Sequence, residues 1–547
     1  MRGTKVRSLL TITSVVVLIA GCGGRSVTDP APGSDANAFL TLSSTTPPAS
    51  GPADTATWAL YRDPTTLDPA TAFDYPENTV ISTMCESLLR QQPDGTLVPG
   101  LASEYRFTTP TSLVFKLRPG VRFWDGTPLT SADVVFSLKR NMDPQLGGFY
   151  GTVLNRITAI SADDPATVTL TLSSPDYWLP GELSSMAGVV IEEKYATSRG
   201  HTYGTPDGGA MCTGPYKLTQ WTAGQTLKVT ANPDYWDPTL KPLTREITFR
   251  GVSDVAALTT GLSTGDINGT WMTDTSSLAQ LQRSENVTVH LGPSLETEFF
   301  IPANLTGVLG DRRVRQALSL AFDRNSFSSA VYGGNAVGPR MSTNPGTWGY
   351  ARDTFKAAWD SAPEPQRDLA KAKDLIAEAG ATGKPLVIGT STGLATVNTT
   401  ANAWVEAANS IGLNASLHNV SPENYINFFT DPQARKDVDA FSTTTYGDYA
   451  DPTALISTYT EPDGVQNYSG YHNDELSAAL NKARIEPDPV RRAQATIEAD
   501  KLVMSELPWI PILHPASFLV LDKKLTGAPS SFVYMQAPWL ARLGRAG

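Results

Sequence analysis

The sequence predicts a mixed α/β protein divided into two or three lobes. The chain has 547 residues and is 40% hydrophobic, which is more apolar material than one compact core normally holds. Short apolar runs of strand length, bounded by glycine and proline, recur along it. Between them lie stretches in which apolar residues recur at the three-to-four spacing of an amphipathic helix. Alternation of these two patterns is typical of α/β folds.

The individual elements follow from these two periods. Strands are predicted at 112–117, 167–172 and 227–230. Helices are predicted at 77–89, 131–141, 253–262, 311–321 and 368–379. Gly380, directly after the last of these, is a typical helix stop. No internal repeat is evident in the sequence.

The first residues have the pattern of an export signal. Three basic residues precede an apolar run over 9–20 that is too short to span a bilayer. The run ends in Leu-Ile-Ala-Gly-Cys at 18–22, which resembles a bacterial lipobox. We therefore predict a lipoprotein signal peptide at 1–22 and acyl chains on Cys22 that hold the mature protein at a membrane surface. The alternative is an ordinary secretory signal beside a chance cysteine.

The segment after the lipobox is predicted to be a tether. Residues 23–53 are rich in Gly, Ser, Thr, Pro and Asp and show no apolar periodicity, which is typical of a flexible linker. No second hydrophobic stretch approaches spanning length, so we expect contact with the membrane through the lipid anchor only. The formal net charge of −11 disfavours nucleic acid as a partner.

The cysteines and histidines limit the chemistry of the body. Cys85 and Cys212, in an exported chain, are equally compatible with a disulfide and with two buried free thiols. Neither belongs to a zinc-ligand pattern, and the five histidines are scattered without paired ligand spacing. We therefore predict no metal site and no cofactor.

Several motifs, separated along the chain, resemble those of a known family. They are Gly-Leu-Ala-Ser-Glu-Tyr at 100–105, Phe-Lys-Leu-Arg-Pro-Gly-Val-Arg-Phe-Trp-Asp-Gly at 115–126, Thr-Ser-Ala-Asp-Val-Val-Phe-Ser at 130–137, Thr-Gly-Pro-Tyr at 213–216, Asn-Pro-Asp-Tyr-Trp at 232–236, and segments 311–324, 372–380 and 506–511. In this order they resemble the extracellular solute-binding proteins of peptide and nickel ABC importers. The resemblance extends from Trp58 to the C-terminus.

The resemblance implies a two-lobed periplasmic-binding-protein fold (class II, or Venus-flytrap) with an extra domain on the first lobe. Lobe I (domain Ia) is expected to combine 54–92, 208–306 and 515–547. The extra domain Ib is expected at 93–207 and lobe II at 307–514. The chain then crosses between the lobes twice, so opening and closing is a rigid-body hinge motion around a ligand held between them.

The resemblance also implies the function. We expect a monomeric substrate-binding lipoprotein, not an enzyme, at the outer face of the cytoplasmic membrane. It would capture peptides and deliver them to permease subunits that work with cytoplasmic ATPases. Two alternatives stay open at this point: a binding protein for haem or a metal chelate, and a scaffold lipoprotein without a transport ligand.

The segment 443–452 carries the predicted ligand site. It resembles the family's strand-to-loop motif, in which an aspartate binds the free α-amino group of a peptide, and that role falls on Asp448. Thr444, Thr445, Tyr446 and Gly447 would exchange backbone hydrogen bonds with the ligand, as in β-strand addition. The alternative for Asp448 is a turn cap before the Asp-Pro pair at 451–452.

Two further features bear on the predicted ligand site: tyrosines at its walls and the absence of a basic residue for the ligand carboxylate. The resemblance places Tyr75 and Tyr150 at the walls of the cleft, although ordinary core tyrosines are an equally good interpretation. No Lys or Arg occurs between Lys384 and Arg435, where relatives that grip very short peptides place an Arg for the ligand carboxylate. Thr445 also stands where the family usually has tryptophan. Peptides longer than dipeptides are therefore expected.

One motif in the sequence is also found in hydrolases. Gly-Leu-Ser-Thr-Gly at 261–265 matches the GxSxG pattern of hydrolases. A nucleophile elbow needs a strand before the serine and a helix after it, whereas here the predicted helix 253–262 comes first. We therefore expect Ser263 not to be a nucleophile.

Overall fold

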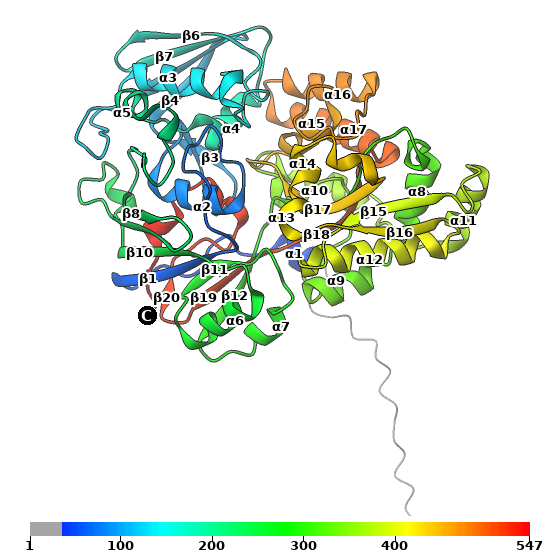
Figure 1. Cartoon of the computed structure of the whole chain (residues 1–547). Helices are drawn as coiled ribbons and strands as arrows, with labels where there is room; N and C mark the ends of the chain where they lie inside the picture. Colours follow the sequence, from blue (N-terminus) through cyan, green and yellow to red (C-terminus); the bar gives the residue numbers. More distant parts are fainter. Residues whose placement is uncertain (1–35) are drawn as a thin grey trace, which may run out of the picture.

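The computed structural model describes residues 36–547 and shows two large lobes with a further domain above the first (Figure 1). The first lobe is built on a seven-stranded sheet, the second on a six-stranded sheet, and the extra domain on a four-stranded antiparallel sheet. The first sheet has the order β12 (Val287–Gly292), β19 (Ser517–Asp522), β11 (Gly269–Trp271), β1 (Ala53–Leu60), β10 (Thr244–Gly251), β9 (Thr226–Ala231) and β8 (Tyr216–Thr222). The second has the order β14 (Ala336–Val337), β18 (Ile510–Pro515), β13 (Glu296–Pro302), β17 (Ala440–Tyr446), β15 (Pro385–Thr390) and β16 (Asn414–Asn419).

The extra domain and two short ribbons complete the strands. The four-stranded sheet has the order β4 (Ala102–Thr109), β5 (Ser112–Leu117), β7 (Thr167–Leu172) and β6 (Ile157–Asp164). The two-stranded ribbons are β2 (Leu89–Gln91) with β3 (Leu97–Pro99), and β20 (Leu525–Thr526) with β21 (Gly544–Arg545).

Helices cover the sheets in each part. Lobe I carries α2 (Tyr75–Met84), α6 (Val255–Thr264) and α7 (Leu278–Leu281), and the extra domain carries α3 (Ser131–Asn141), α4 (Leu179–Glu182) and α5 (Glu193–Arg199). Lobe II carries α8 (Arg312–Ala321), α9 (Arg324–Tyr332), α10 (Arg352–Ser361), α11 (Leu369–Glu378), α12 (Ala395–Ser410), α13 (Pro422–Tyr425), α14 (Asn427–Thr430), α15 (Thr453–Thr460), α16 (Asp474–Arg484) and α17 (Pro489–Glu506). A short α1 (Ala36–Leu40) precedes β1.

Local sequence signals explain several of these elements. Helix α3 begins at a capping box, in which Asp133 accepts hydrogen bonds from the backbone and hydroxyl of Thr130 at 2.9 and 2.8 Å. This helix and strands β5 and β7 confirm the sequence prediction at both ends. The predicted helix 77–89 is wrong at its end, because the chain leaves the helix at Cys85 and pairs as β2.

The N-terminal segment differs from the predicted tether. The side chain of Phe39 in α1 is 8% exposed, and the Thr46 hydroxyl donates to the carbonyl of Ala528 at 2.7 Å. Residues from 36 onward therefore pack against the body, and a tether reaching residue 53 is wrong, because an aromatic side chain and hydroxyl groups there find partners. The predicted signal peptide, Cys22 and the rest of 1–35 lie outside the described residues.

The crossing between lobes also differs from the predicted boundary. Strand β13 pairs with β17 along its whole length, so it belongs to the second lobe, and the predicted end of this lobe I segment at 306 is wrong. The chain crosses first between β12 and β13 and returns at Ala516, between β18 and β19. Composition did not reveal the first crossing, because β12 and β13 are both strands.

A covalent bond lies at the base of the extra domain. The Sγ atoms of Cys85 and Cys212 are joined in the structure, with their Cα atoms 4.9 Å apart. Cys85 ends α2, and Cys212 lies in the segment that leads from the extra domain into β8. Of the two alternatives left open by the sequence, the structure has the disulfide.

Candidate ligand-binding site

Strand β17 carries the predicted site to the boundary between the lobes. It pairs with β13 from Ala440 to Tyr446, whereas its other neighbour, β15, pairs with it only at Ala440. Within residues 36–547, no strand occupies that second edge of β17 at Thr444 and Thr445. The backbone there is therefore available to another extended chain, as β-strand addition requires.

Asp448 follows this strand and meets lobe I. The amide of Gln536 donates to its Oδ1 at 3.0 Å, and the amide of Gln91 donates to its carbonyl at 2.9 Å. Burial raises the pKa of the Asp448 carboxyl to about 7, although the Gln536 hydrogen bond opposes the rise. Within residues 36–547, no basic side chain forms an ion pair with it. A carboxylate enclosed without a cation is suited to bind one.

Asp448 does not act as the turn cap that was its alternative role. The next aspartate, Asp451, performs this function: its carboxylate accepts from the backbone and hydroxyl of Thr453 at 2.9 and 2.5 Å. The side chain of Asp448 accepts a hydrogen bond from the amide of Gln536 in lobe I. Its carboxylate is thus directed to the interface between lobes and away from its own turn.

Tyr75 links the predicted strand to lobe I. Its hydroxyl donates to Glu296 at 2.6 Å, and its ring lies edge-on to that of Tyr446 with centroids 5.1 Å apart. Tyr446 in turn donates to the carbonyl of Phe73 at 2.9 Å. Burial also raises the pKa of Glu296 to about 7. Tyr75 therefore lies where β17 of lobe II reaches the start of α2.

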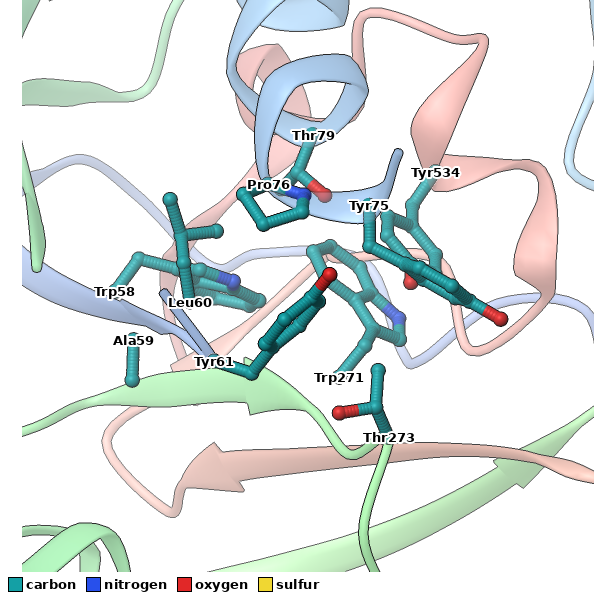
Figure 2. Close-up of a pocket in the computed structure, with 10 residues that line it drawn as sticks. All are labelled: Trp58, Ala59, Leu60, Tyr61, Tyr75, Pro76, Thr79, Trp271, Thr273 and Tyr534. Carbon is teal, nitrogen blue, oxygen red and sulfur yellow. The ribbon is translucent and has the colours of Figure 1, made fainter. Parts of the chain in front are cut away.

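An aromatic pocket opens beside Tyr75 (Figure 2). It is lined by Trp58, Tyr61, Trp271 and Tyr534 together with Tyr75, and the rings of Trp271 and Tyr534 stack 3.8 Å apart. The pocket lies at the carboxyl ends of the parallel strands β1 and β11, where α/β sheets commonly bind ligands. Its free volume of about 10 Å³ holds no more than a water molecule, because the aromatic rings pack against one another in the closed structure.

Tyr150 is buried beside Asp448 and is not an exposed wall. Its side chain is 1% exposed, and its hydroxyl lies beside the amide of Asn78. Burial and then the charge of Asp448 raise the pKa of this tyrosine. Asn78, on α2, is 0% exposed, and its amide has no further hydrogen-bond partner in the structure. Buried polar atoms without partners are unusual in a folded protein and are suited to a bound ligand.

Sequence reasoning missed most of the residues around Asp448. Asn78 and Gln91 come from the consecutive elements α2 and β2, and Gln536 comes from the C-terminal part of lobe I, so the fold brings them to Asp448. Only α2 offered a signal in the sequence, because half of its residues are polar. The structure buries this helix from Pro76 to Met84, which is unusual for so polar a segment.

The extra domain closes the site from the other side. The guanidinium of Arg484 in α16 donates to Asp176 at 2.9 and 2.6 Å, and Arg156 donates to Asn481 at 2.7 Å. These contacts join the extra domain to lobe II. Gln91, in β2 of lobe I, reaches the backbone of Asp448, so the lobes are closed around the site.

Neither a serine nucleophile nor a metal site is formed within residues 36–547. Ser263 lies inside α6, and its hydroxyl donates to the carbonyl of Thr259 at 2.8 Å, which is the reverse of a nucleophile elbow. No three His, Cys, Asp or Glu side chains of that range form a metal-binding group. None of its helices has the length and apolar character of a membrane span.

Comparison with known proteins identifies the family. The family described as "Bacterial extracellular solute-binding proteins, family 5 Middle" matches this chain over residues 96–467. The chain belongs to this family. The periplasmic murein peptide-binding protein MppA of Escherichia coli K12 is 26% identical over 496 residues, covering 85% of this chain and 89% of the relative. The glutathione-binding protein GsiB of Escherichia coli K12 is 26% identical over 472 residues, with the same shares covered.

Solved structures show the same fold. The periplasmic binding protein DppA of Helicobacter pylori, in complex with the peptide STSA, has a TM-score of 0.79 and 21% identity, covering 91% of this chain and 99% of that one. The oligopeptide-binding protein AppA of Bacillus subtilis, with a nonapeptide, has a TM-score of 0.77 and 18% identity, covering 92% and 100%. The two-lobed periplasmic-binding fold predicted from the sequence is confirmed.

Proposed function

We propose that this solute-binding protein captures peptides between its two lobes. The proposal rests on the carboxylate of Asp448, which lies partly buried at the lobe boundary without a cation, next to the unpaired edge of β17. The carboxylate would bind the ligand's α-ammonium, and the strand edge would bind its backbone. Relatives described as murein peptide-binding and glutathione-binding support a peptide ligand.

Closure would complete the recognition. Gln91 and Gln536 of lobe I contact Asp448 of lobe II only when the lobes meet, so a ligand held by both would favour the closed form. Backbone recognition of this kind tolerates many sequences, which suits an importer of mixed peptides.

Calorimetry with a blocked peptide tests this proposal. We expect the full-length protein, purified in detergent, to bind tetra-alanine and to bind N-acetyl-tetra-alanine at least about a hundredfold more weakly, because acetylation removes the ammonium that pairs with Asp448. Equal affinity for the two peptides would contradict the amine site, and binding of neither would contradict peptide capture.

The affinity for peptide should fall as the pH is lowered from about 8 to about 5. In the unliganded closed form the pKa of Asp448 is about 7, and a bound ammonium lowers it, so binding below that pH must expel a proton. The affinity for peptide is therefore highest above the pKa of Asp448 in the unliganded protein and decreases by up to about tenfold per pH unit below it. Glu182, Tyr150 and Tyr446 also face Asp448, and Glu182 would add to the slope.

The same calorimetric titration, repeated across this pH range, measures the slope. A constant dissociation constant between about pH 5 and 8 would contradict an ionised Asp448 as the ligand partner. The matched control is Asp448→Asn, in which the slope should be smaller.

We propose further that the protein is anchored by lipid on Cys22 at the outer face of the cytoplasmic membrane and delivers its ligand, as a monomer, to an ABC importer's permease and ATPase subunits. The lipobox pattern at 18–22 supports the anchor. Membership of the solute-binding family supports the importer.

Cys22→Ser should release the protein from membranes, because acylation requires the cysteine sulfur. Fractionation of cells that express the full chain measures this, with the wild type as control. Retention of the variant in the membrane fraction would show that something other than this lipid holds it.

A further inference from the structure

A second carboxylate, Glu182, lies next to Asp448 and comes from the extra domain. Glu182 is the last residue of α4, and its side chain is 8% exposed. Its neighbour Gly181 packs against the ring of Tyr449 so closely that an added Cβ would lie 2.3 Å from the ring carbons Cδ2 and Cε2. Since Gly181 precedes Glu182 and Tyr449 follows Asp448, this contact brings the two carboxylates to the same interface.

The charge of Glu182 is offset only in part by Arg484 and by a hydrogen bond with Tyr449. Within residues 36–547 no lysine, arginine or histidine forms an ion pair with it. The positive charge of Arg484 lowers the pKa of Glu182, but the Nε and Nη2 atoms of this arginine donate their hydrogen bonds to Asp176. Burial, and then the charge of Asp448, raise the pKa of Glu182. A buried carboxylate in this situation is costly unless a cation joins it.

The surroundings of the two carboxylates contain unused hydrogen-bonding groups. The Oε1 atoms of Gln91 and Gln536 have no hydrogen-bond partner, and the hydroxyl of Tyr150 and the amide of Asn78 meet only each other. Three of these residues already contact Asp448 or are affected by its charge, so they belong to the same enclosed space. Such a concentration of buried, unpartnered polar groups is typical of a site that is satisfied by a ligand.

We propose that Glu182 is a specificity-determining residue that selects peptides with a second cationic group near the α-ammonium, such as lysine or arginine at the first or second position. This inference rests on the proposed function of Asp448. One carboxylate neutralises the α-ammonium, and Glu182 neutralises the side-chain cation. A neutral side chain there leaves the Glu182 carboxylate without a paired cation.

Calorimetry with two pairs of tetrapeptides on the full-length wild-type protein tests the proposal. The pairs are Lys-Ala-Ala-Ala with Met-Ala-Ala-Ala, and Ala-Lys-Ala-Ala with Ala-Met-Ala-Ala; methionine has an unbranched, flexible side chain without the charge. We expect the lysine member of at least one pair to bind about tenfold more tightly, as a buried charge pair would allow. Equal binding within both pairs would overturn this inference alone, whereas no binding by any peptide would overturn the proposed function as well.

Two variants show which residue is responsible. In Glu182→Gln the preference for lysine should disappear, so that the lysine and methionine members of each pair bind within about threefold of each other. The matched control is Glu192→Gln, another buried carboxylate of the extra domain, which lies near Asp125 and Asp133 and should keep the preference. A lysine preference that persists in Glu182→Gln would overturn the assignment.

Discussion

Asp448→Ala weakens peptide binding by about 2–5 kcal/mol, because the ligand's ammonium then loses its buried partner. Gln536 and Gln91 stay in place in this variant, but amides cannot neutralise a positive charge. The effect should be absent for an N-acetylated peptide, which has no ammonium to lose. Isothermal titration calorimetry of the full-length protein with tetra-alanine measures the change.

The control for this variant is Glu298→Gln. Glu298 is also buried, but it lies in β13 of lobe II, where Thr400 donates to it at 2.7 Å and Tyr332 donates a second hydrogen bond. Its substitution should change stability and leave peptide affinity within about threefold of the wild type. An unchanged affinity in Asp448→Ala, in a protein with wild-type circular dichroism, would contradict the amine site.

Removal of the disulfide gives the second large effect. The bond between Cys85 and Cys212 closes a loop over 127 positions, which includes the extra domain. The double variant Cys85→Ser with Cys212→Ser should lose about 4–5 kcal/mol of unfolding free energy, because the unfolded chain is no longer constrained. The midpoint of urea unfolding, followed by tryptophan fluorescence, measures the loss.

Reduction of the wild-type protein provides an independent check of the same bond. Treatment with dithiothreitol should lower the midpoint of the wild type toward that of the double variant and leave the variant unchanged. Two free thiols in denatured, unreduced wild-type protein would show that the bond does not form.

Much of the fold could be predicted because local patterns specify it. The period of two at 112–117 and 167–172 and the capping box before α3 act within a few residues, so the sequence alone locates β5, β7 and α3. The first crossing between lobes could not be predicted, because it depends on which sheet β13 joins. That choice is made by tertiary packing and leaves no mark on composition.

The candidate site shows the same division. Asp448 and its strand were predicted through the family resemblance, since an aspartate before an Asp-Pro pair has a simpler interpretation as a turn cap. Asn78, Gln91 and Gln536 were not predicted, because the fold brings them to Asp448 from distant parts of the chain. Glu182 was not predicted either, since nothing in its sequence neighbourhood distinguishes a carboxylate at an interface from one in solvent.

Native mass spectrometry of the full-length protein, purified without added ligand, shows whether a peptide is the ligand held between the lobes. The proposed function predicts a distribution of co-purified masses that resolve into peptides, each longer than two residues. A single non-peptide mass, such as haem or a metal chelate, would contradict it. So would a protein that stays empty and is not stabilised by any peptide, as expected of a scaffold lipoprotein.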